Sequence, residues 1–259
     1  MFSKNSENVY NPVSFAKFLE NNGDFNNYWF ETGSPSILIK LIKNKSVNIE
    51  EIIKKTYSED IFTAFMPSKR SLIALMYQTG YLTIKSWEKD NRKTVYKLGF
   101  PNVEVEEPFY RRLITSASDA EEINNSLYFD LCDAIKNNDI DTMMSIVDSF
   151  IAEIPYNIQV KNEKYYQTLF YSMFKLMGYS IHTEVCTNTG RIDAVIEYAD
   201  NVYIFEFKLN QTEETAFEQI MEKEYYKSYQ HSGKKITLIG ANFYFSEEHK
   251  PAKWKKLEM

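Results

Sequence analysis

The chain has 259 residues, of which 44% are hydrophobic and 15% aromatic, with 8 Gly and 7 Pro. This composition supplies enough apolar side chains for one or two domains with a large core. The formal net charge of −6 argues against a protein that coats nucleic acid non-specifically, because such proteins neutralise many phosphates and are usually basic.

Short helical patterns separated by polar residues occupy the first eighty residues. Pro12 and Pro35 each follow a polar residue at a helix start, and Gly80 is a helix stop signal. The apolar spacing predicts four helices in this region: Val13–Leu19, Ile37–Ile42, Ile49–Tyr57 and Ser71–Gln78.

Two β-rich runs follow, Tyr81–Trp87 and Lys93–Phe100, and the charged stretch Glu88–Arg92 joins them. A helix followed by a hairpin with a polar tip is the pattern of a winged-helix unit, which binds either DNA or another protein. The charges at the tip nearly cancel, so a solvated loop is the alternative to a DNA contact. These charged residues are Lys89, Arg92 and Lys93 beside Glu88 and Asp90.

The pattern is helical again from Glu107 to about Tyr156. We expect two domains: residues 1–110, a helical region with the winged-helix-like hairpin, and residues 111–259, which open with a helical lead-in. The last hundred residues predict the order helix, three strands, helix, strand. The predicted ranges are Glu163–Leu176, Ser180–Thr187, Arg191–Tyr198, Val202–Leu209, about Glu213–Tyr229 and Lys234–Phe243.

The second and third of these strands are joined by short turn-forming residues and predict a hairpin. A loop with an even number of residues places Asp193 directly opposite Glu206. One face of the hairpin is then continuously apolar, which fixes the register because a slip of one residue would turn that face to solvent. Asp193, Glu206 and Lys208 share the other face.

Two carboxylates that face each other in this way have Cβ atoms about 4.5–5.5 Å apart, which is unfavourable without a cation between them. Lys208 supplies one positive charge, and Mg²⁺ suits the rest because it takes one or two carboxylates and keeps several waters. An exposed ion-pair cluster is the alternative. Against it, Glu206 lies in the otherwise apolar or aromatic run Tyr203–Phe207.

The stretch GRIDAVIEYADNVYIFEFKL, with Asp193 followed by Glu206-Phe207-Lys208, resembles the core of the PD-(D/E)XK nuclease superfamily. More closely, the chain resembles bacterial proteins that join an AAA-ATPase-like domain to such a nuclease. The phrases NYWFETGSPSILIKLI, YQTGYLTIK, YKLGFPN and FEFKLN carry this resemblance, which covers roughly residues 9–257. It implies an α+β or α/β fold class, with a helical winged-helix-like half before a restriction-endonuclease-like αβββαβ core.

The resemblance implies a catalytic set made of Asp193, Glu206, Lys208, Glu163 and Gln219. Asp193 and Glu206 would hold Mg²⁺ or Mn²⁺ together with the main-chain carbonyl of Phe207. Lys208 would orient or activate the attacking water and steady the charge that develops on the phosphate.

Two of these assignments have alternatives. Glu163 is equally well explained as an acid that suits the positive end of a helix dipole. Gln219, which shares a predicted helix face with Lys223 and Tyr226, is also explained as part of an ordinary solvated face. Glu184 lies on the first predicted strand and is expected at the surface.

We therefore expect a Mg²⁺-dependent endonuclease or phosphodiesterase that hydrolyses DNA phosphodiester bonds with a metal-activated water. Cutting of both strands would favour a homodimer. The alternative is a non-catalytic or regulatory module that binds DNA or protein and keeps a relic nuclease fold. The acidic net charge and the lack of a P-loop motif motivate this alternative.

The glycines, cysteines, histidines and apolar runs of the sequence exclude further kinds of binding site and of protein. The sequence contains no GxxxxGK[ST] motif, so we expect no P-loop ATP binding through this chain, and whether an ATPase half belongs with it stays open. Two cysteines imply no disulfide framework, and the three histidines lack zinc-ligand spacing. No apolar run reaches the roughly 18–20 residues that span a bilayer. We expect a cytoplasmic protein that does not bind membranes.

Overall fold

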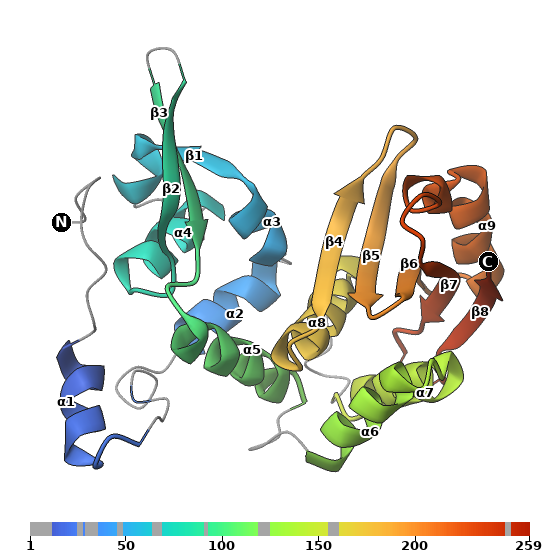
Figure 1. Cartoon of the computed structure of the whole chain (residues 1–259), viewed down its shortest axis with the longest axis horizontal. Coiled ribbons are helices and arrows are strands. Elements are labelled where there is room, and N and C mark those ends of the chain that lie inside the picture. Colours follow the sequence, from blue (N-terminus) through green and yellow to red (C-terminus); the bar gives the residue numbers. More distant parts are fainter. Residues whose placement is uncertain are drawn as a thin grey trace. The chain divides into compact units, whose positions relative to one another are not determined.

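The computed structural model describes residues 12–24, 28, 36–45, 49–63, 69–90, 93–118, 125–154, 161–246 and 250–259. The chain forms two compact units, residues 1–112 and residues 113–259, and each is described by itself (Figure 1). The division falls inside helix α5 (Val103–Ser118), two residues after the expected boundary. Predictions that involve Pro35 and Arg92 lie outside the described residues. No helix in the described ranges is long and apolar enough to cross a membrane.

The first unit combines short helices with a three-stranded antiparallel sheet of order β1-β3-β2. The strands are β1 (Thr56–Ser58), β2 (Thr83–Asp90) and β3 (Lys93–Gly99). The helices before α5 are α1 (Pro12–Glu20), α2 (Ser36–Lys45), α3 (Ile49–Lys54), the 3₁₀ helix η2 (Glu59–Thr63) and α4 (Lys69–Gln78). A helix thus precedes a β-hairpin, as expected, while the winged-helix assignment stays a prediction.

The expected helix Ile49–Tyr57 is wrong at its end. Helix α3 stops at Lys54, and the next residues form β1, in which Tyr57 pairs with Tyr96 of β3. The Phe62 ring also packs edge-on against the Tyr96 ring, with centroids 5.1 Å apart. The strand pairing and the ring contact bury aromatic surface. Continuing the helix by another turn would lose this packing, so the tertiary contacts outweigh the local helical pattern.

The second unit contains the remaining elements and a five-stranded sheet of order β4-β5-β6-β7-β8, in which only the β6–β7 pair is parallel. Its helices are α6 (Asn125–Lys136), α7 (Ile140–Ala152), α8 (Glu163–Leu176), α9 (Glu213–Glu222) and the 3₁₀ helix η3 (Tyr225–Ser228). Its strands are β4 (Ser180–Cys186), β5 (Arg191–Tyr198), β6 (Asn201–Leu209), β7 (Lys235–Phe243) and β8 (Lys253–Glu258). The predicted αβββαβ order is present as α8, β4, β5, β6, α9 and β7.

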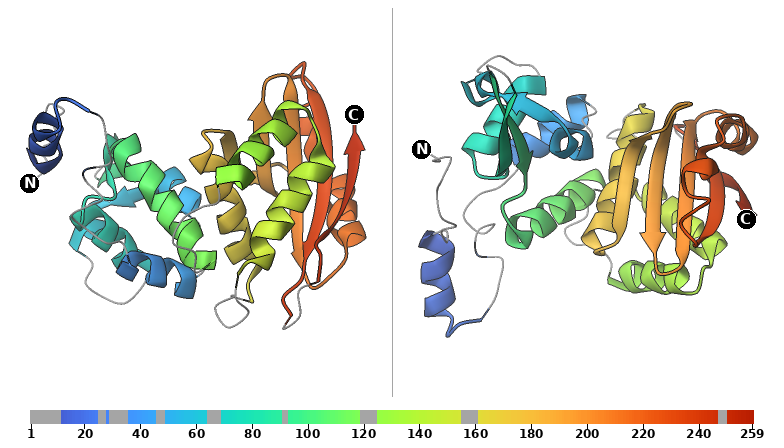
Figure 2. Two further views of the ribbon diagram at one scale, coloured as in Figure 1. Left: turned by 90° about the horizontal axis from the view of Figure 1, so that it is seen from below. Right: turned by 45° about the horizontal axis from the view of Figure 1, so that its top comes forward.

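Helices cover both faces of this sheet. Helices α6, α7 and α8 lie on one face and α9 lies on the other (Figure 2). On the first face the Phe170 ring of α8 meets Phe205 and Phe207 at centroid distances of 5.0 and 4.9 Å. On the second face Ile220 of α9 belongs to one buried cluster with Ile204 of β6. The central strand β6 is therefore held from both sides, and most of its residues are buried, as are half of those in β5.

Two expectations for this unit are wrong. The second helix ends at Glu222 instead of near Tyr229, because Glu224 adopts a left-handed backbone (φ 50°) and the chain turns into η3, which buries Tyr225. Strand β8 was not expected at all. Its lysine-rich sequence does not alternate like a strand, but two of its side chains, Trp254 and Lys256, donate hydrogen bonds to Asp141 of α7.

Gly240 of β7 allows α9 to lie directly against the sheet. A Cβ added at Gly240 would lie 2.7 Å from Cα of Phe217, which is closer than real Cβ contacts. Gly240→Ala must therefore push α9 off the strand that neighbours Glu206. We expect the free energy of unfolding to fall by about 1–3 kcal/mol, as for other overpacked cores. Urea unfolding of this variant measures the loss, with Gly178→Asn as a control at a left-handed position with nothing within 4 Å. Equal stability of the wild type and Gly240→Ala would contradict the prediction.

Candidate active site

The candidate site lies where strands β5 and β6 separate. Their antiparallel pairing has the predicted register and the two-residue loop 199–200, and its last pair is Ala194 with Phe205. One step further, Asp193 and Glu206 would face each other, but the ladder is broken there. The Phe207 N–H donates to Asp193 Oδ2 at 2.8 Å. The Asp193 carboxylate thus replaces a main-chain carbonyl as the acceptor of this N–H. The hydrogen bond holds the Asp193 side chain where the two strands separate.

The carboxylate of Glu206 lies deep inside this opening. The residue is only 2% exposed, and its Oε1 accepts from Lys208 Nζ at 2.8 Å. The other oxygen, Oε2, is buried and has no hydrogen-bond partner among the described residues. An unpartnered buried carboxylate oxygen is costly, and in a native protein it calls for an unseen water or ion.

Burial strongly disfavours the charges of both carboxyl groups. It raises the pKa of Asp193 to about 7, although the Phe207 N–H opposes this shift, and the charge of Glu163 adds to it. Burial raises the pKa of Glu206 to about 8, and the neighbouring charge of Asp193 adds to the effect. For Lys208, burial lowers the pKa, but the hydrogen bond that Lys208 donates to Glu206 and the charges of the nearby acids outweigh this effect, so the net pKa rises. Two acids that resist ionisation side by side are typical of a functional site.

Glu163 belongs to this electrostatic group. It is the first residue of α8, half-buried, and the Asn162 side chain caps the helix by accepting from the Lys164 N–H at 2.9 Å. Burial raises the pKa of Glu163, and the charge of Lys208 opposes this shift. The structure thus brings Glu163 into range of the three core residues, while its catalytic role stays a prediction.

Gln219 has a different environment from the one predicted. Its Nε2 donates to Tyr225 Oη at 3.5 Å, and Tyr225 Oη donates to the main-chain carbonyl of Arg191 at 2.8 Å. Because α9 ends at Glu222, Lys223 is its C-cap and Tyr226 lies in η3, so the predicted common helix face of these residues is absent. Gln219 is thus linked through Tyr225 to the strand that carries Asp193.

Removing the Tyr225 hydroxyl should loosen this link. The Tyr225 ring is 1% exposed, so Tyr225→Phe leaves the Arg191 carbonyl without its donor inside the protein. We expect a loss of about 1–3 kcal/mol in the free energy of unfolding, measured by urea denaturation. Tyr229→Phe is the matched control, because Tyr229 packs against the same cluster and its hydroxyl makes no hydrogen bond within the described residues. Equal losses for the two variants would contradict the assigned role of the hydroxyl.

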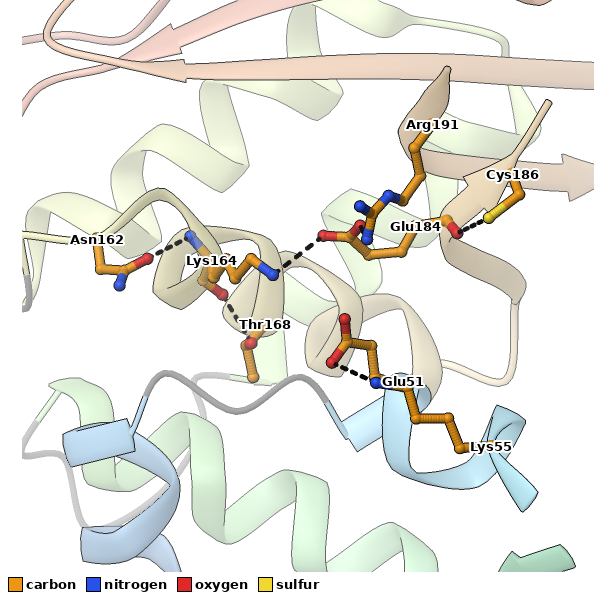
Figure 3. Close-up of polar contacts among 8 residues, drawn as sticks. All are labelled: Glu51, Lys55, Asn162, Lys164, Thr168, Glu184, Cys186 and Arg191. Atoms are coloured by element: carbon orange, nitrogen blue, oxygen red, sulfur yellow. Dashed lines mark hydrogen bonds and ion pairs between the residues drawn. The ribbon is translucent and has the colours of Figure 1, made fainter. Parts of the chain in front are cut away.

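The expected surface position of Glu184 is wrong. Its side chain is only 12% exposed and lies between two cations: Arg191 Nη1 at 2.6 Å and Lys164 Nζ at 3.8 Å (Figure 3). Thr183 pairs with Ala194 and Val185 with Ile192, so Glu184 stands opposite Asp193 in the register. The position of Glu184 follows from the pairing of β4 with β5, so the register of β5 and β6 alone does not reveal it.

The residues present fit a hard divalent cation. The carboxylates of Asp193 and Glu206 and the main-chain carbonyl of Phe207 offer oxygen ligands, which Mg²⁺ and Mn²⁺ prefer, and Glu206 Oε2 has no other partner within the described residues. Within the described ranges no group of three or more His, Cys, Asp or Glu side chains is arranged to enclose a metal. Two carboxylates with waters are sufficient for Mg²⁺, which seldom occupies a site built from protein ligands alone.

Comparison with known proteins agrees with this geometry. Residues 161–252, which run from the start of α8 through β7, match the family model described as the PD-(D/E)XK nuclease superfamily. The chain is also 30% identical over 248 residues to an uncharacterized protein in the vnfD 5′ region of Azotobacter chroococcum mcd 1. That alignment covers 92% of this chain and 47% of the relative, so the chain spans about half the relative's length. The family match supports the PD-(D/E)XK nuclease superfamily for the segment that carries Asp193, Glu206 and Lys208.

Proposed function

We propose that the second unit is a Mg²⁺- or Mn²⁺-dependent nuclease that hydrolyses DNA phosphodiester bonds. One observation carries the proposal: Glu206 Oε2 is buried beside Asp193 and has no hydrogen-bond partner in the part of the chain that the structure describes, while Lys208 donates to Oε1. Burying two carboxylates with one amine leaves negative charge that a divalent cation would neutralise. A purely structural ion pair would not need the second acid.

The residues of the site have distinct roles in this proposal. Asp193, Glu206 and the Phe207 carbonyl hold the ion, which when bound supplies a Lewis acid for the phosphate oxygen and lowers the pKa of a water. Lys208, kept protonated by Glu206, lies where it can stabilise the charge that builds on the phosphate. Water attacks phosphorus, the bond from phosphorus to the leaving sugar oxygen breaks, and that oxygen takes up a proton. Glu163 and Gln219 are proposed to assist through charge and orientation.

Metal-dependent cleavage tests this function directly. The wild type, Asp193→Ala and Lys256→Ala are incubated with supercoiled plasmid and with a labelled single strand, in Mg²⁺, Mn²⁺ or EDTA. We expect cleavage by the wild type and Lys256→Ala only when metal is present, and none by Asp193→Ala. Lys256 is a suitable control because it is paired with Asp141 at the far edge of the sheet. Cleavage that persists in EDTA or in Asp193→Ala would overturn the assignment.

The first unit supports a second candidate function, a winged-helix-like region that binds DNA or a protein. Residues 1–112 contain 16 Lys and Arg against 13 Asp and Glu, whereas residues 113–259 contain 14 against 23. The basic excess therefore lies in the unit that carries the β2–β3 hairpin, where Trp87 is 41% exposed. If the nuclease fold is a relic, a variant lacking Asp193, Glu206 and Lys208 will keep full cellular function. Loss of function in that variant would reject this candidate.

A further inference from the structure

Two cations at the edge of the candidate site both contact the carboxylate of Glu184. Arg191 begins β5, two residues before Asp193, and its guanidinium is 2.6 Å from Glu184. Lys164, in the first turn of α8 and next to Glu163, reaches the same carboxylate at 3.8 Å. Figure 3 shows both side chains converging on Glu184 from different elements. We refer to Lys164, Glu184 and Arg191 as the cation clamp.

The two cations of the clamp are accessible, whereas their acidic partner is not. The side chains of Arg191 and Lys164 are 53% and 43% exposed, and that of Glu184 is 12% exposed. Glu184 also has a left-handed backbone (φ 52°) within a strand, which is rare for a residue other than glycine and costs roughly 1 kcal/mol or more. Strand β4 thus keeps an unfavourable backbone conformation at Glu184, the residue that stands opposite Asp193 and forms ion pairs with both cations.

Charge balance indicates what the clamp is suited to bind. Lys208 lies among Asp193, Glu206 and Glu163 and is already paired with Glu206. The unit as a whole is also acidic, with 23 Asp and Glu against 14 Lys and Arg. A phosphodiester chain that reaches Asp193 therefore needs other cations beside the site. The guanidinium of Arg191 and the ammonium of Lys164 can donate hydrogen bonds to phosphate oxygens.

We propose that Arg191 and Lys164 bind the phosphodiester backbone of the substrate next to the cleaved bond, in exchange for their ion pairs with Glu184. This inference rests on the proposed nuclease function and deepens it. Glu184 is a positioning residue: it holds the two cations in place in the free protein and competes with phosphate for them. The competition predicts opposite effects for the two kinds of substitution, because loss of a cation weakens binding and neutralisation of Glu184 strengthens it.

Equilibrium binding tests the clamp without any cleavage. Fluorescence anisotropy follows labelled 20-nucleotide DNA and RNA, single- and double-stranded, in EDTA at about 50 mM KCl. We expect Arg191→Ala to raise the Kd about tenfold and Lys164→Ala about threefold, each with a shallower salt dependence by roughly one ion. Glu184→Gln should lower the Kd about threefold. Lys256→Ala, three strands and roughly 14 Å away from β5 in the sheet, should leave the Kd unchanged.

A merely structural clamp gives a different result. In that case all three substitutions lower the thermal midpoint, while none changes the Kd beyond the Lys256→Ala control. That outcome would overturn the proposal. So would a Glu184→Gln variant that binds more weakly than the wild type, or a wild type that binds no oligonucleotide. Because the readout is binding in EDTA, opposite shifts of Kd would support the clamp even if no cleavage occurs, and unchanged Kd values would reject it even if the metal-dependent nuclease is active.

Discussion

Replacing Lys208 by Met is expected to slow cleavage by about 10²–10³-fold while leaving the site able to bind metal at least as tightly as the wild type. Lys208 Nζ occupies Oε1 of Glu206 at 2.8 Å and is itself largely buried, so it competes with any cation for that carboxylate. Removing the amine frees an oxygen for the ion but removes the positive charge that stabilises the phosphate in the transition state. The loss of one such group reduces rates by about 10²–10³-fold.

Two measurements separate these effects. Titration calorimetry with Mn²⁺ gives the metal affinity of the wild type and Lys208→Met, and single-turnover cleavage of labelled DNA gives the rate. Lys227→Met is the matched control, because Lys227 forms an equally short ion pair of 2.7 Å with Glu224 on the exposed surface. A parallel loss of metal affinity and rate would show that Lys208 only organises the site, and an unchanged rate would remove it from the chemistry.

The hairpin that carries the site was predictable because two local signals agree. The turn-forming residues at 199–200 and the alternation of apolar residues in β5 and β6 define a single register, and the observed pairs Val195 with Ile204 and Ala194 with Phe205 confirm it. Burial of one face makes any slip expensive. That register brings Asp193 and Glu206 to the end of the paired segment, but the predicted pair of Asp193 directly opposite Glu206 is not formed, because the ladder stops at Ala194 and Phe205.

The break in the ladder was not predictable from alternation. It depends on Asp193 Oδ2 accepting the Phe207 N–H, which opens the strands without changing the pattern of apolar residues. The position of Glu184 depends on a third strand and on a left-handed residue that only tertiary contacts explain. The same applies to β8, which is held by Asp141, more than one hundred residues earlier in the chain. Contacts between distant segments leave no local signal.

The raised pKa values of the two acids predict that the metal-free protein loses stability as the pH rises. In the unfolded chain Asp193 and Glu206 ionise near their ordinary values, but in the folded protein their pKa values are about 7 and 8. Between about pH 4 and pH 8 the folded state therefore binds more protons than the unfolded state, so the free energy of unfolding falls across this window. Divalent metal should offset the fall, because it binds the deprotonated carboxylates.

Asp193→Asn is expected to be more stable than the wild type at pH 8 in EDTA, on the order of 2 kcal/mol, and equally stable below about pH 4. The amide oxygen still accepts the Phe207 N–H, while the cost of burying a charge disappears. Urea unfolding from pH 4 to pH 8, with and without Mg²⁺, measures both effects. In Mg²⁺ the order should reverse, because only the wild type gains stability from the ion. A wild type whose metal-free stability rises with pH, or an Asn variant that is less stable at pH 8, would mean that burial does not disfavour the charges of these two acids in the folded protein. The case for a cation between Asp193 and Glu206 would then lose its physical basis.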